Sequence, residues 1–391
     1  MFNIILLGLV SFFTDVSSEM VYPLLPLFLT VQLGATPAVV GVIEGLAEST
    51  ASLLKVFSGA LSDRLGRRKP LTIAGYTTST LSRLLFYLAT SWGWVLSGRL
   101  ADRFGKGVRT APRDALIADS SDPRAYGLSF GLHRALDTFG ALAGASLAYF
   151  FVSRTPGDLR PVFLYAMIPA VLGVFLLFFV RERKEQKPTA GRRLNLSWRE
   201  LDPRLKAFLA VVFLFTLGNS SNQFLLLRAQ NLGFPLKEVI FLYLLYIAVY
   251  GLVAYPAGRL SDHIGRRRLL VWGYFTYGIV YLGFALAHRP ETLWVLFAAY
   301  GIYSAATEGV EKALVADIAP QKQRATLIGL HATLVGIGLF PASLVAGLLW
   351  NTVSPAAPFY FGGGIGILTA TALQIVLRSR GKDHVSGTES G

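Results

Sequence analysis

The chain has 391 residues, of which 53% are hydrophobic and only 15% are charged. This balance is too apolar for a soluble protein and places the chain in a lipid bilayer. The net charge of +14 is spread over short basic segments between apolar stretches, which argues against one basic face for nucleic acid, and the lack of cysteine excludes disulfides, thiolate metal ligands and cysteine nucleophiles.

The apolar stretches predict an all-α membrane protein with twelve transmembrane helices, because a helix needs roughly 20 mainly apolar residues to cross a bilayer. The first stretch reads as a retained span rather than a signal peptide, because it lacks a basic start and contains Asp15 and Glu19. The expected centres of the spans are Asp15, Ala47, Thr80, Lys106, Gly140, Ala170, Gly218, Ile247, Tyr277, Ser304, Gly336 and Leu368.

Acidic residues occur in pairs one helical turn apart on the first two spans. Asp15 and Glu19 form one pair, and Glu44 and Glu48 form the other, so each pair shares a helix face. Carboxylates inside a membrane are costly and are candidates for carrying protons. We expect these four residues, with Asp137 on the fifth span, to bind and release protons; the alternative is static salt bridges with Lys55, Arg83 or cations of the fourth span.

A loop sequence occurs twice, each time between two apolar segments. GALSDRLGRRKPL at 59–71 returns as GRLSDHIGRRRLL at 258–270, and two further matches, ALIAD with ALVAD and GLH with GLH, lie at nearly the same offset. The repeat predicts two six-helix bundles of equal orientation, which makes them parallel repeats. The predicted division is 1–181 for the first bundle, 182–205 for a linker, 206–381 for the second bundle and 382–391 for a disordered tail.

The fourth span concentrates charge on one face. At about 100° per residue, its charged residues fall within an arc of roughly 140°, and they must therefore face protein or water rather than lipid. We expect Arg103, Lys106 and Arg109 to present a positive wall to an anionic or zwitterionic solute; the alternative is that they neutralise the acids of spans one and two. The charged residues in the arc are Arg99, Asp102, Arg103, Lys106, Arg109, Arg113 and Asp114.

Basic residues gather in alternate loops. Clusters such as 64–69, 181–193 and 266–268 fall on one side if the spans alternate, whereas the opposite loops carry little positive charge. The positive-inside rule then predicts a multi-pass protein of the cytoplasmic (inner) membrane with both termini in the cytoplasm.

The repeated Gly-x-Leu-x-Asp-x-x-Gly-Arg-Arg loop, between spans two and three and again between spans eight and nine, resembles the signature loop of the major facilitator superfamily. This resemblance covers essentially the whole chain and implies secondary transport by alternating access, with spans one, four, seven and ten lining the path. It also implies that Asp63 meets the region of Arg324, and Asp262 that of Arg124. The loop residues predicted to act as gates are Gly59, Asp63, Gly66, Arg67, Arg68, Asp262, Gly265 and Arg266.

The second half is expected to supply a polar, mildly acidic wall, with Asn222 and Glu308 as substrate contacts and tyrosines such as Tyr246 and Tyr300 as further contacts. The predicted function is a proton-coupled carrier, expected to be monomeric, for a small organic anion or zwitterion. No cofactor, metal site or nucleic-acid partner is expected. The alternatives are a polyspecific drug/proton antiporter, suggested by a partial glycine pattern at 131, 140 and 144, and, in other classes, an intramembrane lipid-modifying enzyme or a receptor that does not transport.

Overall fold

The computed structural model describes residues 2–65, 67–121, 126–154, 157–182, 201–319 and 324–376. Within these ranges the protein is helical without strands, and the helices account for all twelve predicted spans. Most of the predicted linker, 183–200, and the predicted tail, 382–391, lie outside the described residues. The first half comprises α1 (Phe2–Val21), α2 (Leu25–Leu27), η1 (Phe28–Gln32), α3 (Pro37–Leu65), α4 (Lys69–Tyr87), α5 (Trp92–Asp119), α6 (Tyr126–Arg154), α7 (Arg160–Tyr165) and α8 (Met167–Leu177).

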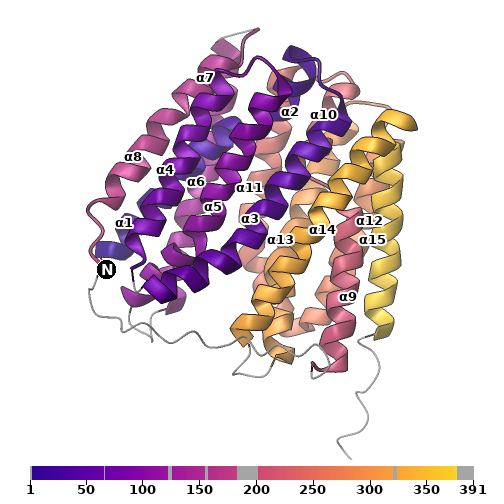
Figure 1. Ribbon diagram of the computed structural model, residues 1–391. Helices are drawn as coiled ribbons and strands as arrows, with labels where there is room; N and C mark the ends of the chain where they lie inside the picture. Colours follow the sequence, from indigo (N-terminus) through magenta and orange to yellow (C-terminus); the bar gives the residue numbers. More distant parts are fainter. Residues whose placement is uncertain are drawn as a thin grey trace, which may run out of the picture.

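The second half repeats this order. Figure 1 shows it beside the first half, with the helices of both halves running between the same two ends of the molecule. Its helices are α9 (Pro203–Gly218), α10 (Gln223–Asn231), α11 (Leu236–Ile264), α12 (Arg266–Leu286), α13 (Thr292–Ile318), α14 (Arg324–Thr352) and α15 (Ala357–Val376).

The first span of each half is broken at a corresponding place. α1 ends at Val21, where Pro23 and Pro26 remove backbone donors that a continuous helix would need. α9 ends at Gly218, and the run Asn219 to Asn222 follows, whose short polar side chains compete for backbone hydrogen bonds. The segments beyond the breaks, α2 and α10, contact each other. We call this end of the molecule the closed end, and the opposite end, where α3 and α11 finish in the repeated loops, the loop end.

The two halves meet through α3 against α14 and α6 against α11. Glycines allow backbone contact near the closed end: a Cβ on Gly41 would lie 2.2 Å from the Ser343 carbonyl oxygen, and one on Gly347 would lie 2.7 Å from the Cα of Ala38. Toward the loop end the lower parts of α3 and α14 diverge (Figure 1), and Gly59 of α3 has its near neighbour on α5 instead. The halves are therefore packed tightly at the closed end.

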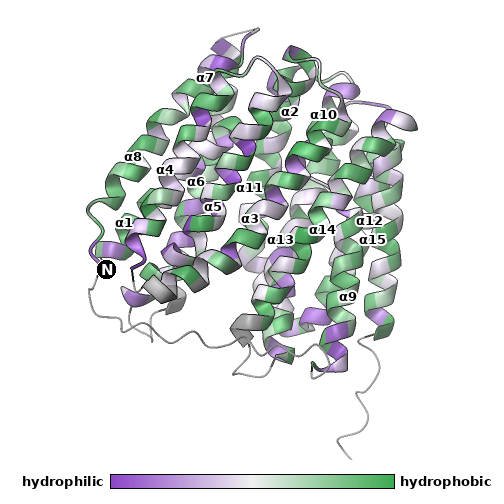
Figure 2. Ribbon diagram, viewed as in Figure 1, coloured by the Kyte–Doolittle hydropathy of each residue, from purple (hydrophilic) through white to green (hydrophobic). Residues whose placement is uncertain are grey.

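Eight helical segments of the described residues are long and apolar enough to cross a membrane by themselves. The other four spans, α3, α4, α5 and α13, are not among these segments, and α5 carries charged residues along its length. Figure 2 shows this contrast between the hydrophobic α8 and the hydrophilic turns of α5. α5 packs against α3 and α4, and its Arg99 and Asp102 are only 3% and 4% exposed, so the charged face of this helix lies within protein.

Candidate functional site

A network of ion pairs joins α5 to the helices on either side of it. Arg99 of α5 donates two hydrogen bonds to Glu44 of α3, at 2.6 and 2.7 Å. The next turn of α5 repeats the arrangement, with Arg103 Nε 3.1 Å from a Glu48 carboxylate oxygen. Two of the carboxylates predicted to carry protons, Glu44 and Glu48, thus form ion pairs with arginines of the fourth span in this structure.

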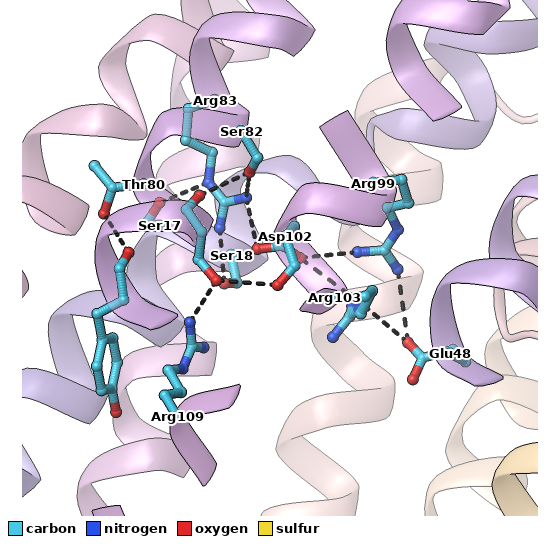
Figure 3. Close-up of polar contacts among 12 residues, drawn as sticks. Ser17, Ser18, Glu48, Thr80, Ser82, Arg83, Arg99, Asp102, Arg103 and Arg109 are labelled. Atoms are coloured by element: carbon cyan, nitrogen blue, oxygen red, sulfur yellow. Dashed lines mark hydrogen bonds and ion pairs between the residues drawn. The ribbon is translucent and has the colours of Figure 1, made fainter. Parts of the chain in front are cut away.

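Asp102 lies between two arginines, as Figure 3 shows. One carboxylate oxygen is 3.1 Å from Arg83 of α4 and the other is 3.3 Å from Arg99. Arg83 also donates to Ser17 and Ser18 of α1, at 3.0 and 2.9 Å. Its guanidinium therefore ties α1, α4 and α5 together, and buried charges that are paired in this way stabilise one packing of the half.

The three cations predicted to contact substrate have different environments. Arg103 is paired with Glu48. Arg109 is buried against α4, where it donates to Ser79 at 2.6 Å and lies 4.3 Å from the centre of the Tyr76 ring. Lys106 is half-buried, and its side chain makes no hydrogen bond or ion pair with any described residue. Of the three, Lys106 is the cation whose side chain has no hydrogen-bond or ion-pair partner in the described part of the chain.

The acids of α1 have partners of a different kind. Asp15 is half-buried and forms no hydrogen bond or ion pair within the described part of the chain, although the charges of Asp137 and Lys106 act on it. Glu19, one turn later, accepts a 2.8 Å hydrogen bond from Tyr243 of α11, in the other half. Asp137 lies 3.5 Å from His133, a full turn away on α6.

Polar contacts between the halves converge on α11. Besides Tyr243, its Tyr250 accepts a hydrogen bond from Arg134 of α6 at 2.8 Å and donates one to Glu308 of α13 at 2.7 Å. The Tyr22 ring of the first half packs 5.6 Å from the Tyr243 ring. The stripe of tyrosines on α11 therefore forms much of the polar contact between the two halves.

The second half contains a pocket of about 210 Å³ between α9, α11, α13 and α14. Its wall carries the aromatic rings of Phe215, Tyr246, Tyr300 and Tyr303, and its acids are Glu308 and Glu311, the latter bound to Tyr274 and His331. The lining contains no Lys or Arg. This pocket includes both Asn222 and Glu308, which the sequence analysis predicted as substrate contacts.

The asparagines at the break after α9 fix the tyrosines of the pocket. Tyr300 donates to the Asn222 side-chain oxygen at 2.7 Å, and the Asn219 amide donates to the Tyr303 hydroxyl at 3.2 Å. Phe215 and Ser304 also line the pocket; neither was predicted as a substrate contact, and Ser304 was expected only as the centre of a span. The signal for its aromatic wall was the helical spacing of tyrosines at 243, 246 and 250 and at 300 and 303.

Ion pairs of similar form occur at the loop end of each half. Arg68 pairs with Asp119 at the end of α5, and Arg266 pairs with Asp317 at the end of α13. The loop motif aligns Arg266 with Arg67, but Arg67 is exposed and the residue in the first ion pair is Arg68. Gly265, at φ +92°, closes the second loop directly before α12, whereas α4 begins at Lys69.

Several of the predicted gate residues lie partly or wholly outside the described residues. This applies to Gly66, to the side chain of Asp63, and to the regions of Arg124 and Arg324 that Asp262 and Asp63 were expected to meet. Asp262 itself is exposed and lies 3.5 Å from Arg266. In the described ranges, no group of three or more His, Asp or Glu residues is placed to hold a metal ion.

Comparison with known proteins agrees with the geometry. The model of the Major Facilitator Superfamily matches the chain twice, over residues 7–227 and 207–390. An uncharacterized MFS-type transporter of Methanocaldococcus jannaschii is 39% identical, covering 96% of this chain and 94% of its own. The multidrug resistance protein MdtH of Photorhabdus laumondii is 25% identical, over 90% and 89% of the two chains.

The fold is also found in solved structures. The nucleoside transporter NupG superposes with a TM-score of 0.78 at 15% identity, covering 96% of this chain and 99% of its own. At that identity the likeness concerns the fold alone. With a family model matching both halves and a relative of high identity over nearly its full length, the chain belongs to the Major Facilitator Superfamily of membrane transporters.

Proposed function

We propose that this transporter moves a small organic anion or zwitterion across the cytoplasmic membrane by alternating access and couples that movement to protons. The observation that carries the proposal is the pair Lys106 and Asp15. Each is half-buried inside the first half without a hydrogen bond or ion pair in the described chain, while the arginines around them are paired with acids or held by polar and aromatic groups. A membrane-embedded charge without a partner is a functional site by default.

The acid group of the substrate would bind Lys106. Its ammonium lies in a region where Arg103 and Lys55 add positive charge and Glu48 is already engaged by Arg103. An incoming carboxylate or phosphate would therefore gain a charge-assisted hydrogen bond without displacing an existing pair.

Protons would be carried by Asp15, with Glu19 beside it. Asp15 lies within range of the charge on Lys106, so protonation of this carboxyl changes the field at the substrate-binding cation. Glu19 would connect protonation to the relative movement of the two halves, because its carboxylate accepts a hydrogen bond from Tyr243 of the opposite half. Binding and release would then be coupled to the contacts between the halves.

The orientation follows from the basic loops at the loop end, which the positive-inside rule assigns to the cytoplasm. In that orientation the closed end faces outward, where α2 contacts α10. The structure then corresponds to a carrier closed toward the outside, and rocking of the halves about the α3–α14 and α6–α11 contacts would expose the centre to either side.

The test is uptake by purified protein in liposomes, with a panel of radiolabelled monocarboxylates, amino acids and phosphate esters and an imposed pH gradient. We expect Lys106→Met to abolish uptake of the solutes that the wild type accepts. Lys237→Met, which removes an exposed lysine in the first turn of α11, serves as the matched control. Full uptake by Lys106→Met would refute the substrate role of this lysine.

The second candidate is a drug/proton antiporter. It is supported by the aromatic and acidic lining of the pocket in the second half and by the 25% identity to MdtH, which is named as a multidrug resistance protein. Export of tetraphenylphosphonium against its gradient, unaffected by Lys106→Met, would favour this candidate over a carrier of anions or zwitterions.

A further inference from the structure

The pocket of the second half has the composition of a binding site for a positively charged organic group. The rings of Tyr246, Tyr300 and Tyr303 form a continuous wall, with centroid distances of 5.4 Å for the first pair and 5.3 Å for the second. Phe215 adds a further ring, 6.2 Å from Tyr303. The faces of aromatic rings carry negative potential and attract cations within about 6 Å.

The tyrosines are fixed by their hydroxyl groups. Asn222 accepts a hydrogen bond from Tyr300 and donates to Tyr246, at 2.7 and 3.5 Å, and Asn219 donates to Tyr303. Tyr300 donates its hydroxyl proton to Asn222, whereas the hydroxyls of Tyr246 and Tyr303 accept from the asparagines. These bonds fix the positions of the rings that line the pocket. A ring wall held in this way is preorganised for a ligand.

The charged residues that line the pocket are both acids. Its lining contains Glu308 and Glu311 and no basic residue, and the side chain of Glu308 is 51% exposed. Glu311 is bonded to His331 and Tyr274, so Glu308 is the more accessible carboxylate. Arg134 approaches Glu308 from the first half, at 3.8 Å, and leaves most of its surface open.

The pocket is connected to the first half through Tyr243 of α11, which neighbours the pocket residue Tyr246. Tyr243 packs against Tyr246 at 5.8 Å and donates to Glu19, on which the charge of Lys106 also acts. A solute in this region would meet electron-rich rings and a carboxylate on one side and an ammonium on the other. Such a solute is matched best when it carries opposite charges at its two ends.

We propose that the tyrosine pocket binds an organic ammonium group, so that the substrate is a zwitterion whose ammonium lies among Tyr246, Tyr300 and Tyr303 and whose acid group reaches Lys106. This rests on the proposed transport of an anion or zwitterion and narrows it to one class. The volume of about 210 Å³ accommodates an alkylated ammonium with a short chain.

Three probes of one shape separate the contributions of the two charges. They are 4-(trimethylammonio)butyrate, which has both charges, butyltrimethylammonium, which has the positive one, and 5,5-dimethylhexanoate, which has the negative one. We expect purified full-length protein in detergent, measured by calorimetry, to bind the zwitterion about tenfold more tightly than either single-charge probe.

Substitutions then test which residues of the pocket contact the ammonium group of the probe. Tyr300→Leu and Glu308→Gln should each weaken binding of butyltrimethylammonium about fivefold. Tyr300→Phe, which keeps the ring and loses the hydrogen bond to Asn222, should weaken it less than Tyr300→Leu, and Tyr255→Leu, at a tyrosine that is 72% exposed, should leave it unchanged. Because Glu308 is exposed, its substitution keeps the test valid should Tyr300→Leu not fold.

The outcomes distinguish the two proposals. Equal binding of the zwitterion and 5,5-dimethylhexanoate, or no binding of either ammonium probe at millimolar concentration, would overturn the ammonium pocket and leave the anion carrier standing. Binding of butyltrimethylammonium as tight as that of the zwitterion, unaltered by Lys106→Met, would instead support the pocket and remove the role of Lys106.

Discussion

The two halves share one fold and differ in what they place on the matching helices α5 and α13. In the register that aligns Asp119 with Asp317, the positions of Asp102, Lys106 and Arg109 correspond to those of Tyr300, Ser304 and Thr307. The first set belongs to a charged region crossed by ion pairs, and the second lines a pocket without basic residues. The same helix position in this architecture thus carries either a charged side chain or an uncharged one that lines a pocket.

The two halves are stabilised by different kinds of interaction. Buried ion pairs between α3, α4 and α5 fix the first half, and aromatic packing with amide bonds fixes the second. Removing one member of a buried ion pair leaves an uncompensated charge, whereas removing a ring leaves a cavity. Substitutions should therefore affect the first half through charge and the second through volume.

The largest expected effect is on the stability of the first half. Arg99→Ala leaves Glu44 and Asp102 without their shared cation and should lower the free energy of unfolding by about 3–5 kcal/mol. Thermal unfolding in detergent, followed by tryptophan fluorescence, measures the loss. Arg154→Ala, at an exposed arginine at the end of α6, is the control.

A double variant tests whether charge is the cause. Arg99→Met combined with Glu44→Leu removes both members of the pair that Arg99 forms with α3 and should recover part of the stability lost in Arg99→Ala. If the double variant is less stable than Arg99→Ala, lost packing rather than uncompensated charge causes the loss of stability. Substitutions in the first half would then act through volume, as they are expected to do in the second half.

The second largest effect is expected on the coupling of solute uptake to the proton gradient. Asp15→Asn removes a carboxyl that lacks a partner among the described residues, so the variant should fold normally but lose at least about tenfold in uptake driven by a pH gradient. Exchange of solute at equal pH should persist, because it needs no net proton movement. Glu291→Gln, at an exposed glutamate before α13, controls for a change of charge. An undiminished response to the gradient would remove Asp15 from the coupling role.

The sequence predicted the architecture well, because transmembrane length and a duplicated loop are local signals. Each expected span centre lies in a helix, with Gly218 at the last residue of α9. The charged arc of the fourth span also placed Arg99 and Asp102 in protein rather than lipid. These features follow from the periodicity of apolar and charged residues, which is visible in the sequence itself.

The detailed site was harder to predict, because pairing depends on contacts between helices distant in the sequence. Nothing in the spacing of α5 shows that Arg103 engages Glu48 and Arg109 stacks on Tyr76, while Lys106 between them has neither kind of partner. The tyrosine pocket likewise depends on asparagines at a helix break that meet rings from two other helices. Helical periodicity gives a face, but tertiary packing selects which residues of that face stay available.

A smaller effect is expected at the contact between the halves. Tyr243→Phe keeps the ring and removes the hydrogen bond to Glu19, a charge-assisted bond worth about 1.5–3 kcal/mol. The variant should shift the population away from the closed-end contact by roughly tenfold or more. Because the chain has no cysteine, a single cysteine introduced in α10 reports this shift as faster labelling from the outside.

Tyr250→Phe provides a second measurement on the same helix. It removes the hydrogen bonds to Arg134 and Glu308, and because these groups are more than half exposed, its effect on labelling should be weaker than that of Tyr243→Phe. If Tyr250→Phe instead changes labelling more than Tyr243→Phe, the hydrogen bond that contributes most to the contact between the halves is the one at Arg134 and not the one at Glu19.

The smallest effects are expected at the loop end, where the halves are alike. Arg68→Ala and Arg266→Ala each remove a partly exposed ion pair to the end of α5 or α13, and each should change the free energy of unfolding by about 1 kcal/mol or less. Both should shift cysteine labelling in the same direction, since the pairs occupy corresponding places. Arg67→Ala should do less than Arg68→Ala, because the exposed Arg67 makes no ion pair in the described chain, even though the motif aligns it with Arg266. If Arg67→Ala has the larger effect, Arg67 rather than Arg68 is the functional counterpart of Arg266, as the motif aligns them. The two loops would then not differ in which arginine forms the ion pair.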